Sequence, residues 1–128
     1  MKIGERASLE EILAKTSDAL FPAELGKRPV SISSVDCDGD TPLHVMARRN
    51  DAYAVQVLIE AGANVNAVGD MSETPLHVAL KNGNVAVVEL LLAAGADVEL
   101  RSEFNQTPRE LMGASRALRM LLKQHGHD

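Results

Sequence analysis

The tetrapeptide Thr-Pro-Leu-His occurs twice in this chain, at residues 41–44 and 74–77, and the copies are 33 residues apart. A third, eroded copy begins at Thr107-Pro108, after the same interval. Self-similarity with a fixed period of this size indicates a protein built from stacked repeats. In such proteins each unit buries its apolar face against its neighbours, so the chain is expected to fold as an array.

A second motif repeats with the same period. Gly-Ala-Asn-Val-Asn-Ala at residues 62–67 is followed by Gly-Ala-Asp-Val-Glu-Leu at residues 95–100, and an aliphatic run precedes each glycine. Together these motifs resemble the ankyrin repeat family, whose unit is a turn, two antiparallel helices and a hairpin. The resemblance covers residues 36 to about 126. It implies an all-α repeat solenoid in which helix-turn-helix repeats are joined by β-hairpin-like loops.

The length of 128 residues and the 45% content of hydrophobic residues are typical of one domain with a continuous core. The repeat period divides this domain into a helical N-terminal cap at residues 1–35, repeat 1 at 36–68, repeat 2 at 69–101 and a shortened C-terminal capping repeat at 102–128. For residues 1–35 the alternative is a docking element that contacts the partner itself.

Capping residues and apolar periodicity predict the individual elements. Ser8 and Glu11 have the spacing of a capping box at a helix start. Helices are expected at about 9–20, 42–49, 52–60, 75–81 and 85–93. A short helix from Pro22 to about Gly26, and an extended segment at 30–33, are expected before repeat 1.

The third repeat departs from the pattern of the first two. Arg109 and Glu110 stand where the earlier copies have Leu and His, and the loop between the two helices is two residues shorter. A polar outer side is what a terminal repeat needs for solubility. The inward side is expected to keep four leucines, Leu111, Leu118, Leu121 and Leu122.

Composition narrows the classes of partner and compartment. The formal net charge of -5 disfavours direct binding of nucleic acid, which depends on Lys and Arg. A single cysteine excludes an internal disulfide, and no apolar run resembles a signal peptide or a membrane span. A monomer in the cytoplasm, without a cofactor and without a membrane partner, is therefore expected.

Two histidines, His44 and His77, invite a metal-binding or catalytic interpretation. Stacked units would place them about 10 Å apart, the usual spacing between packed helices. One zinc ion cannot bridge that distance, since its nitrogen ligands lie about 2.1 Å from the metal. The resemblance implies instead that each ring bonds the threonine of its own repeat and a neighbouring loop.

The segment before the first Thr-Pro carries Asp36, Cys37, Asp38 and Asp40. Its alternating carboxylates superficially suit calcium, but the later residues of an EF-hand loop are missing. The resemblance implies that Asp36 forms the turn and that Cys37, Asp38 and Asp40 are exposed at its tip. Cys37 lacks a neighbouring general base, because His44 is already assigned to the scaffold.

The resemblance also implies where function lies, on a concave face made of hairpin tips and first helices. In this family the positions before Thr-Pro and at the end of the first helix vary with the partner. Here they are Cys37, Asp38, Asp40, Arg48, Arg49, Asp70, Met71, Glu73, Lys81, Asn82, Glu103, Phe104 and Gln106.

Met71 and Phe104 are large apolar side chains expected at hairpin tips, where burial is not required. They are interpreted either as contact anchors or as a local pack of one tip against the next. The resemblance implies a non-enzymatic protein-binding module. The acidic tips indicate that its protein partner has a basic rim. The alternative is a small enzyme or metal-binding protein that uses Cys37, His44 and nearby carboxylates.

Overall fold

The computed structural model describes residues 8–20, 30–113 and 115–126. Its elements are, in chain order, α1 (Leu9–Leu20), α2 (Pro42–Arg48), α3 (Ala52–Glu60), the 3₁₀ turn η2 (Asp70–Ser72), α4 (Pro75–Asn82), α5 (Val85–Ala93), α6 (Pro108–Met112) and α7 (Arg116–Gln124). No strand occurs among these described residues. The all-α repeat solenoid expected from the sequence is confirmed.

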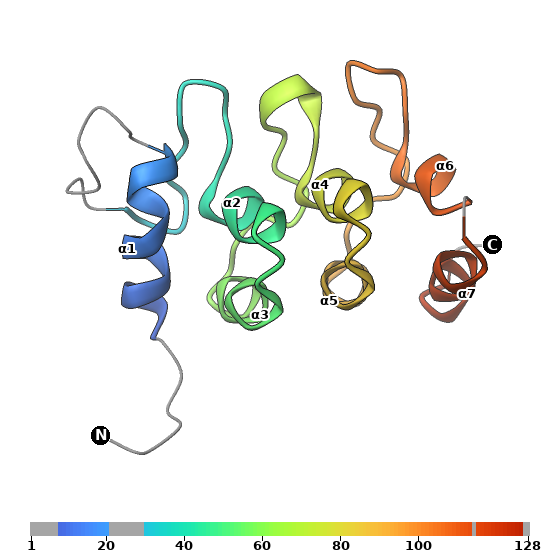
Figure 1. Cartoon of the computed structure of the whole chain (residues 1–128), viewed down its shortest axis with the longest axis horizontal. Helices are drawn as coiled ribbons and strands as arrows, with labels where there is room; N and C mark the ends of the chain where they lie inside the picture. Colours follow the sequence, from blue (N-terminus) through green and yellow to red (C-terminus); the bar gives the residue numbers. More distant parts are fainter. Residues whose placement is uncertain (1–7, 21–29, 114, 127–128) are drawn as a thin grey trace.

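The helices form two layers, as Figure 1 shows. The first helices of the units, α2, α4 and α6, lie side by side, and the second helices, α3, α5 and α7, form the layer beneath them. The hairpin loops all project from the same edge, beyond the first helices. At the N-terminal end, α1 packs against α2 and α3.

The same capping device starts each first helix. The Thr41 hydroxyl accepts from the backbone N–H of His44, and the His44 ring accepts from the Thr41 N–H at 3.0 Å. Thr74 starts α4 in the same way. In α6 a glutamate replaces the histidine, and Glu110 accepts from the Thr107 N–H at 2.9 Å. The proline that follows each threonine lacks the N–H that a first helical position leaves unpaired.

A glycine in the left-handed backbone conformation follows each of the second helices α3 and α5. Gly62, with φ of 100°, follows α3, and Gly95, with φ of 90°, follows α5. Glycine reaches this conformation without a steric cost, which is why it stands just past a helix end. Both helices have the bounds that the sequence predicts, whereas α2 ends one residue earlier and α4 one residue later than predicted.

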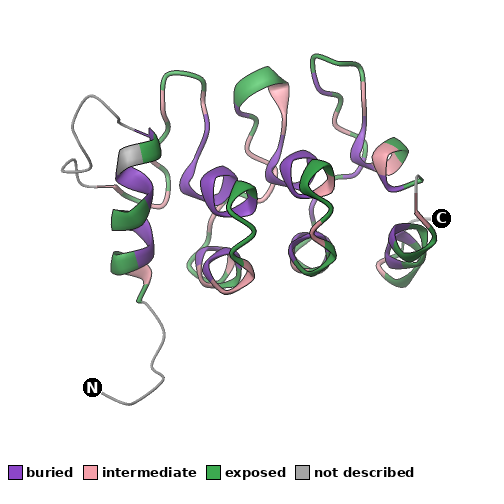
Figure 2. Cartoon of the chain, viewed as in Figure 1, coloured by how far each residue is buried: buried purple, intermediate pink, exposed green. Residues whose placement is uncertain are grey.

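The core is aliphatic and runs through every unit, as the buried stripe in Figure 2 shows. From α1 it receives Ile12 and Leu13, and Thr16 of the same stripe is also buried. Its largest fully buried side chains include Leu43, Met46, Leu58, Leu76, Leu91 and Met112. Because these side chains belong to one cluster that runs through helices of neighbouring units, each unit buries its apolar face against the next.

Two expectations near the N-terminus have different outcomes. The extended segment predicted at residues 30–33 is wrong, since the Ser34 N–H donates to the Ser31 carbonyl at 3.1 Å and closes a turn. The Ser34 hydroxyl also accepts from the Ser31 N–H at 2.9 Å. Serine side chains stabilise turns by such local bonds. Here these bonds outweigh the alternation of apolar and polar residues, which favours an extended segment. The short helix expected after Pro22 lies outside the described residues.

The third repeat is shortened in its first helix, so the shorter loop expected from the sequence is wrong. The helix α6 has five residues where α2 has seven, whereas residues 113–115 separate α6 from α7 just as residues 49–51 separate α2 from α3. Leu118, Leu121 and Leu122 are buried, as predicted. Leu111 is only partly buried, however, and its neighbour Met112 is the fully buried side chain of α6. With only five residues in α6, Met112 is the side chain that reaches the core. Within the described residues, no helix has the length and apolar character needed to cross a bilayer.

Candidate interaction surface

The buried histidines join one repeat to the next. In His44, Nδ1 lies 3.0 Å from the Thr41 hydroxyl, and Nε2 lies 2.9 Å from the carbonyl oxygen of Glu73 in the following unit. Because a backbone N–H only donates and a carbonyl only accepts, the ring carries its proton on Nε2. His77 makes the same bonds to Thr74 and, at 3.0 Å, to the Gln106 carbonyl. The structural role expected for both residues is confirmed.

Burial lowers the pKa of His44, because the apolar surroundings disfavour the charged ring. The Glu73 carbonyl, which accepts the Nε2 proton, partly offsets this effect. The ring is therefore held neutral, with both nitrogens in use.

The hairpin tips align matching positions of the three repeats. Asp38, Met71 and Phe104 are 33 residues apart and stand at the equivalent tip position of each hairpin. The side chains of Met71 and Phe104 are large and apolar, yet 45% and 55% of their residue surfaces are exposed. Asp70 and Glu103 flank them and are exposed as well. We call the five residues Asp38, Asp70, Met71, Glu103 and Phe104 the tip ridge.

The first and second tips are joined through Asp40. Its Oδ1 accepts from the Asp70 N–H at 2.9 Å, and its Oδ2 lies 3.1 Å from the Arg48 guanidinium. Only 6% of Asp40 is exposed, so the prediction that it is an exposed tip residue is wrong. Its position depends on Gly69, where a Cβ atom would lie 2.1 Å from Asp40 Oδ1. The missing side chain of Gly69 lets the carboxylate reach the second hairpin.

The second and third tips are joined by backbone. The carbonyl of Met71 accepts from the Glu103 N–H at 2.9 Å. Met71 and Ser72 both have φ of 57°, the left-handed conformation, which costs a residue with a side chain about 1–2 kcal/mol. Such strain persists only where the surrounding structure enforces it. The Met71–Glu103 bond therefore connects the backbone of the second tip, in this conformation, to the third tip.

Comparison with family models identifies ankyrin repeats, in three copies, over residues 11–102, which is well over half of the chain. The chain belongs to the ankyrin repeat family. Comparison with curated protein sequences finds no significant match. Ankyrin repeats are generally protein–protein interaction modules without enzymatic activity. The matched region begins within α1, which the sequence motifs had left outside the repeats.

Each of the first two ankyrin repeats carries an acid–base pair at the same positions. Asp40 pairs with Arg48, and its counterpart Glu73 pairs with Lys81. The Lys81 ammonium also lies 4.5 Å from the centroid of the Phe104 ring. These pairs were not predicted from the sequence. The signal that could have revealed them is an acid just before Thr-Pro and a base at the end of the first helix, which recur with the 33-residue period.

Three other predicted contact residues also bind their own chain. Arg49 donates to the Lys15 carbonyl of α1 at 2.8 Å. Asn82 donates to the Arg48 carbonyl at 3.0 Å and so covers the end of α2. The carbonyl of Gln106 is the acceptor for His77. Their side chains or backbone tie neighbouring repeats together, a role that the sequence did not predict.

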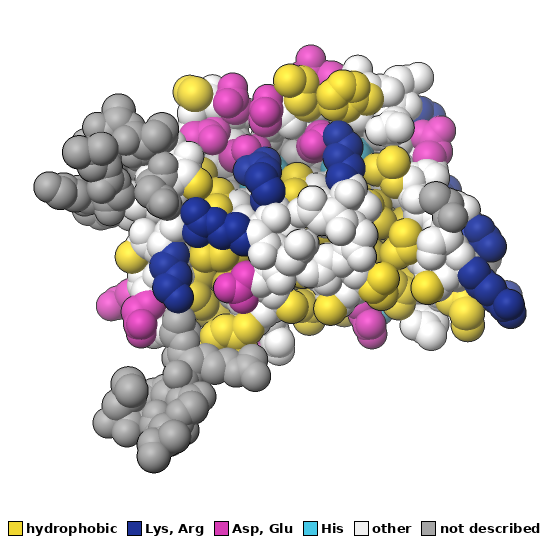
Figure 3. All heavy atoms as spheres, in the orientation of Figure 1, with side chains coloured by type: hydrophobic (Ala, Val, Ile, Leu, Met, Phe, Trp, Pro, Cys, Tyr) yellow, Lys and Arg dark blue, Asp and Glu magenta, His cyan; other side chains and the backbone are white. Residues whose placement is uncertain are grey.

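The tip ridge has an excess of negative charge. Among the described residues Asp38, Asp70 and Glu103 form no ion pair. The nearby Asp70 carboxylate is the main cause that raises the pKa of Asp38, followed by desolvation and by Asp36 and Asp40. Figure 3 shows acidic and apolar side chains along the edge of the hairpin tips, with Lys and Arg below them. The ridge thus combines exposed apolar anchors with uncompensated acids.

The residues of the alternative enzyme or metal interpretation, Cys37 and His44, have different surroundings in the structure. Cys37 is exposed and free, but both nitrogens of His44 are occupied by Thr41 and Glu73. His44 is therefore unable to serve as its base. The described part of the chain contains no group of three His, Cys, Asp or Glu residues arranged to hold a metal ion.

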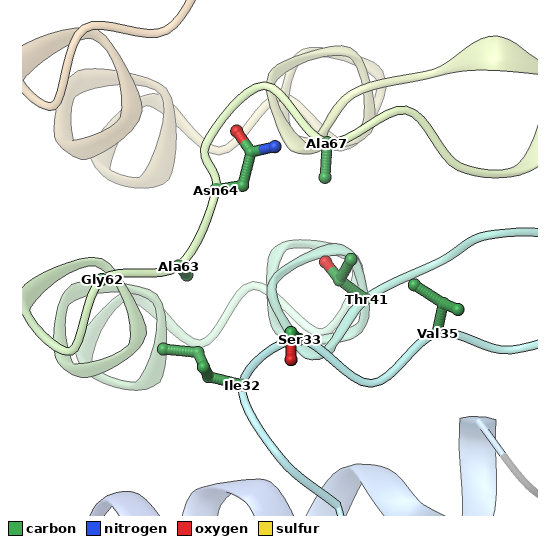
Figure 4. A pocket seen from close by; sticks show the side chains of 8 residues that line it. All are labelled: Ile32, Ser33, Val35, Thr41, Gly62, Ala63, Asn64 and Ala67. Carbon is green, nitrogen blue, oxygen red and sulfur yellow. The ribbon is translucent and has the colours of Figure 1, made fainter.

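A pocket of about 290 Å³ lies beside the first repeat, between the loop before α2 and the loop after α3 (Figure 4). Ile32, Ser33 and Val35 line one side, and Ala63, Asn64 and Ala67 line the other. One period later, Asn66 and Leu100 occupy the positions of Ser33 and Ala67, and the Asn66 amide oxygen accepts from the Asp97 N–H at 2.7 Å. The first unit thus has smaller side chains at these two positions than the second unit has.

Proposed function

We propose that this ankyrin protein binds a protein partner with a basic rim through the tip ridge and the adjoining concave face. The observation that supports this most is the pair of exposed apolar side chains, Met71 and Phe104, on hairpin tips that are hydrogen bonded to each other. The acids beside them, Asp70 and Glu103, form no ion pair with any residue in the described part of the chain. Exposed aromatic and methionine side chains ringed by polar groups are typical of binding hot spots.

Rigidity explains how so small a surface could bind usefully. The tips are already joined by the Asp40–Asp70 and Met71–Glu103 hydrogen bonds, and Lys81 fixes one side of the Phe104 ring. A partner would therefore pay little ordering entropy on the ankyrin side of the interface. The acids would mainly speed association with a basic partner and exclude acidic ones.

A pull-down from extract of the native cell tests the proposal. The Met71→Ala/Phe104→Ala double variant should lose the partner, with affinity falling roughly tenfold or more. Met120→Ala is the matched control, since Met120 is 54% exposed but lies on α7, away from the ridge. Binding should weaken as salt rises. A partner that ignores both salt and the double substitution would contradict the proposal.

We also propose a monomer in the cytoplasm, with residues 1–35 acting as a cap. The packing of α1 on α2 and α3 supports the cap, because α1 covers apolar surface that would otherwise meet water. The exposed, free thiol of Cys37 supports a reducing compartment. Light scattering of the purified chain and fractionation of the native cell test these two points. A dimer in solution or a secreted chain would contradict them.

A further inference from the structure

Four of the backbone N–H groups at the tips are hydrogen bonded within the chain. The tip N–H groups donate to nearby acceptors, namely Asp38 to the Asp36 carboxylate at 2.8 Å, Asp70 to Asp40 at 2.9 Å, Glu103 to Met71 at 2.9 Å and Phe104 to the Ser102 hydroxyl at 3.2 Å. A peptide strand gains affinity by pairing with free backbone groups along an edge. The tip ridge offers its side chains instead.

The side chains of the ridge change in character from the first hairpin to the third. At the matching position of the three tips, Asp38 is acidic whereas Met71 and Phe104 are large and apolar. The acids Asp70 and Glu103 flank these two apolar side chains at the second and third tips. At the third tip the Lys81 ammonium, which is paired with Glu73, already lies over the Phe104 ring, so that face of the ring is not open to a cation of the partner. A partner segment that follows the ridge therefore needs its cation over the first hairpin and apolar groups over the other two.

Repeat spacing determines how far apart those groups stand on the partner. The first helices α2, α4 and α6 pack side by side, and packed helices lie about 8–10 Å apart. An α-helix rises about 1.5 Å per residue, so seven residues span about 10 Å. Seven residues also return to nearly the same face, with a drift of about 20°. A helix lying along the ridge would thus meet one tip with every seventh residue.

From the proposed function of the ridge, on which this step rests, we infer that its occupant is an amphipathic helix. The helix places Lys or Arg against Asp38 and Asp70, and large apolar side chains against Met71 and Phe104, at intervals of seven residues. The backbone bonds of a helix are satisfied internally, which suits a surface where the N–H groups of Asp70, Glu103 and Phe104 are already bonded. The three tips recognise the helix through side-chain contacts alone.

A display library of single-helix peptides tests this inference. The peptides are randomised at every position that a bound helix can present to the ridge, and they are selected for binding. The full chain is the bait, and the Met71→Ala/Phe104→Ala variant serves for counter-selection. Selected peptides should carry Lys or Arg at one end of a seven-residue pattern and Leu, Met or Phe at the next two positions. A selected peptide with a central proline should bind roughly tenfold more weakly, since proline breaks the helix.

Charge reversal identifies the end that carries the cation. Asp38→Lys should weaken binding of a selected peptide roughly tenfold, and replacing the Lys or Arg of that peptide by Glu should restore it. Glu89→Lys is the matched control, because Glu89 is exposed on α5, away from the tips, and it should leave binding unchanged.

The outcomes separate this inference from the function on which it rests. Selected peptides without a seven-residue pattern, or no enrichment over the counter-selection, would overturn the helical occupant. The pull-down with the double variant would still decide whether the ridge binds a protein. If that variant kept its partner, the proposed function itself would fall.

Discussion

The carboxylate of Asp40 and the backbone N–H of Asp70, 30 residues apart in the chain, form a 2.9 Å hydrogen bond that joins the first two hairpins. Asp40 holds this position with almost no exposed surface, and the same carboxylate pairs with Arg48. The bond depends on the absence of a side chain at Gly69, so a substitution there tests how much this junction stabilises the array.

Gly69→Ala is expected to destabilise the protein by about 1–3 kcal/mol, the usual cost of overpacking. The added Cβ would lie 2.1 Å from Asp40 Oδ1 and 2.9 Å from His44 Nε2. Urea unfolding measures the loss. In the Asp40→Ala background the same substitution should cost clearly less, because the closest clashing atom is gone. Equal costs in both backgrounds would show that Asp40 does not restrict this position.

Stability should fall as the pH drops below about 6.5, the ordinary pKa of histidine, because of His44. Its pKa in the folded state is lowered by burial, so the unfolded chain binds the proton more readily. The neutral ring of His44 therefore contributes its full stability above about pH 6.5. This stability is lost as the pH falls through the lower pKa that His44 has in the folded protein. Asp40 and Asp36 oppose this lowering and Arg48 adds to it.

The matched variant for this pH effect is His44→Gln. A glutamine at this position preserves an acceptor for the Thr41 N–H, as glutamine does in capping boxes, but does not titrate. The variant should be less stable at neutral pH because it loses the ring bond to Glu73, yet its unfolding midpoint should change less between pH 7.5 and 5.5, two values on either side of about 6.5. If the stability of the variant depended on pH as strongly as that of the parent protein, His44 would be excluded as the source of the pH effect.

The sequence was sufficient for the parts of the fold that depend on local chemistry. Thr41 with Pro42 starts a helix and Gly62 ends one through bonds within a few residues, so these bounds could be predicted. The burial of Asp40 could not, because it depends on Gly69 in the next repeat. The tip ridge falls between these cases, since its residues could be named in advance but their shared bonds could not.

Glu110 should make the third repeat sensitive to acid. The bond from the Thr107 N–H is the main cause that lowers the pKa of Glu110, and the Thr107 hydroxyl and Arg101 add to it. A carboxylate with a lowered pKa contributes stability above its ordinary value of 4.5 and loses it as pH falls through the folded value.

Glu110→Ala should therefore lower the thermal midpoint at neutral pH and remove part of the acid-induced loss. Glu110→Gln keeps an acceptor for the Thr107 N–H, so it should stay closer to the parent protein at neutral pH while losing the same acid dependence. Thermal unfolding followed by circular dichroism at several pH values measures both. An alanine variant as stable as the parent would mean that this capping box contributes nothing.

Ala67→Leu should stabilise the protein, because it places in the first repeat the side chain that the second repeat has at the same position. The pocket of about 290 Å³ beside Ala67 has room for the added carbons, and Leu100 occupies the matching position one period later. Filling a cavity commonly contributes about 0.5–2 kcal/mol. Ala93→Leu, at an exposed position of α5, is the control for added apolar surface alone. Urea unfolding should show a higher midpoint for Ala67→Leu only, and a lower one would mean that the loops around Ile32 and Ala63 leave no room for the larger side chain.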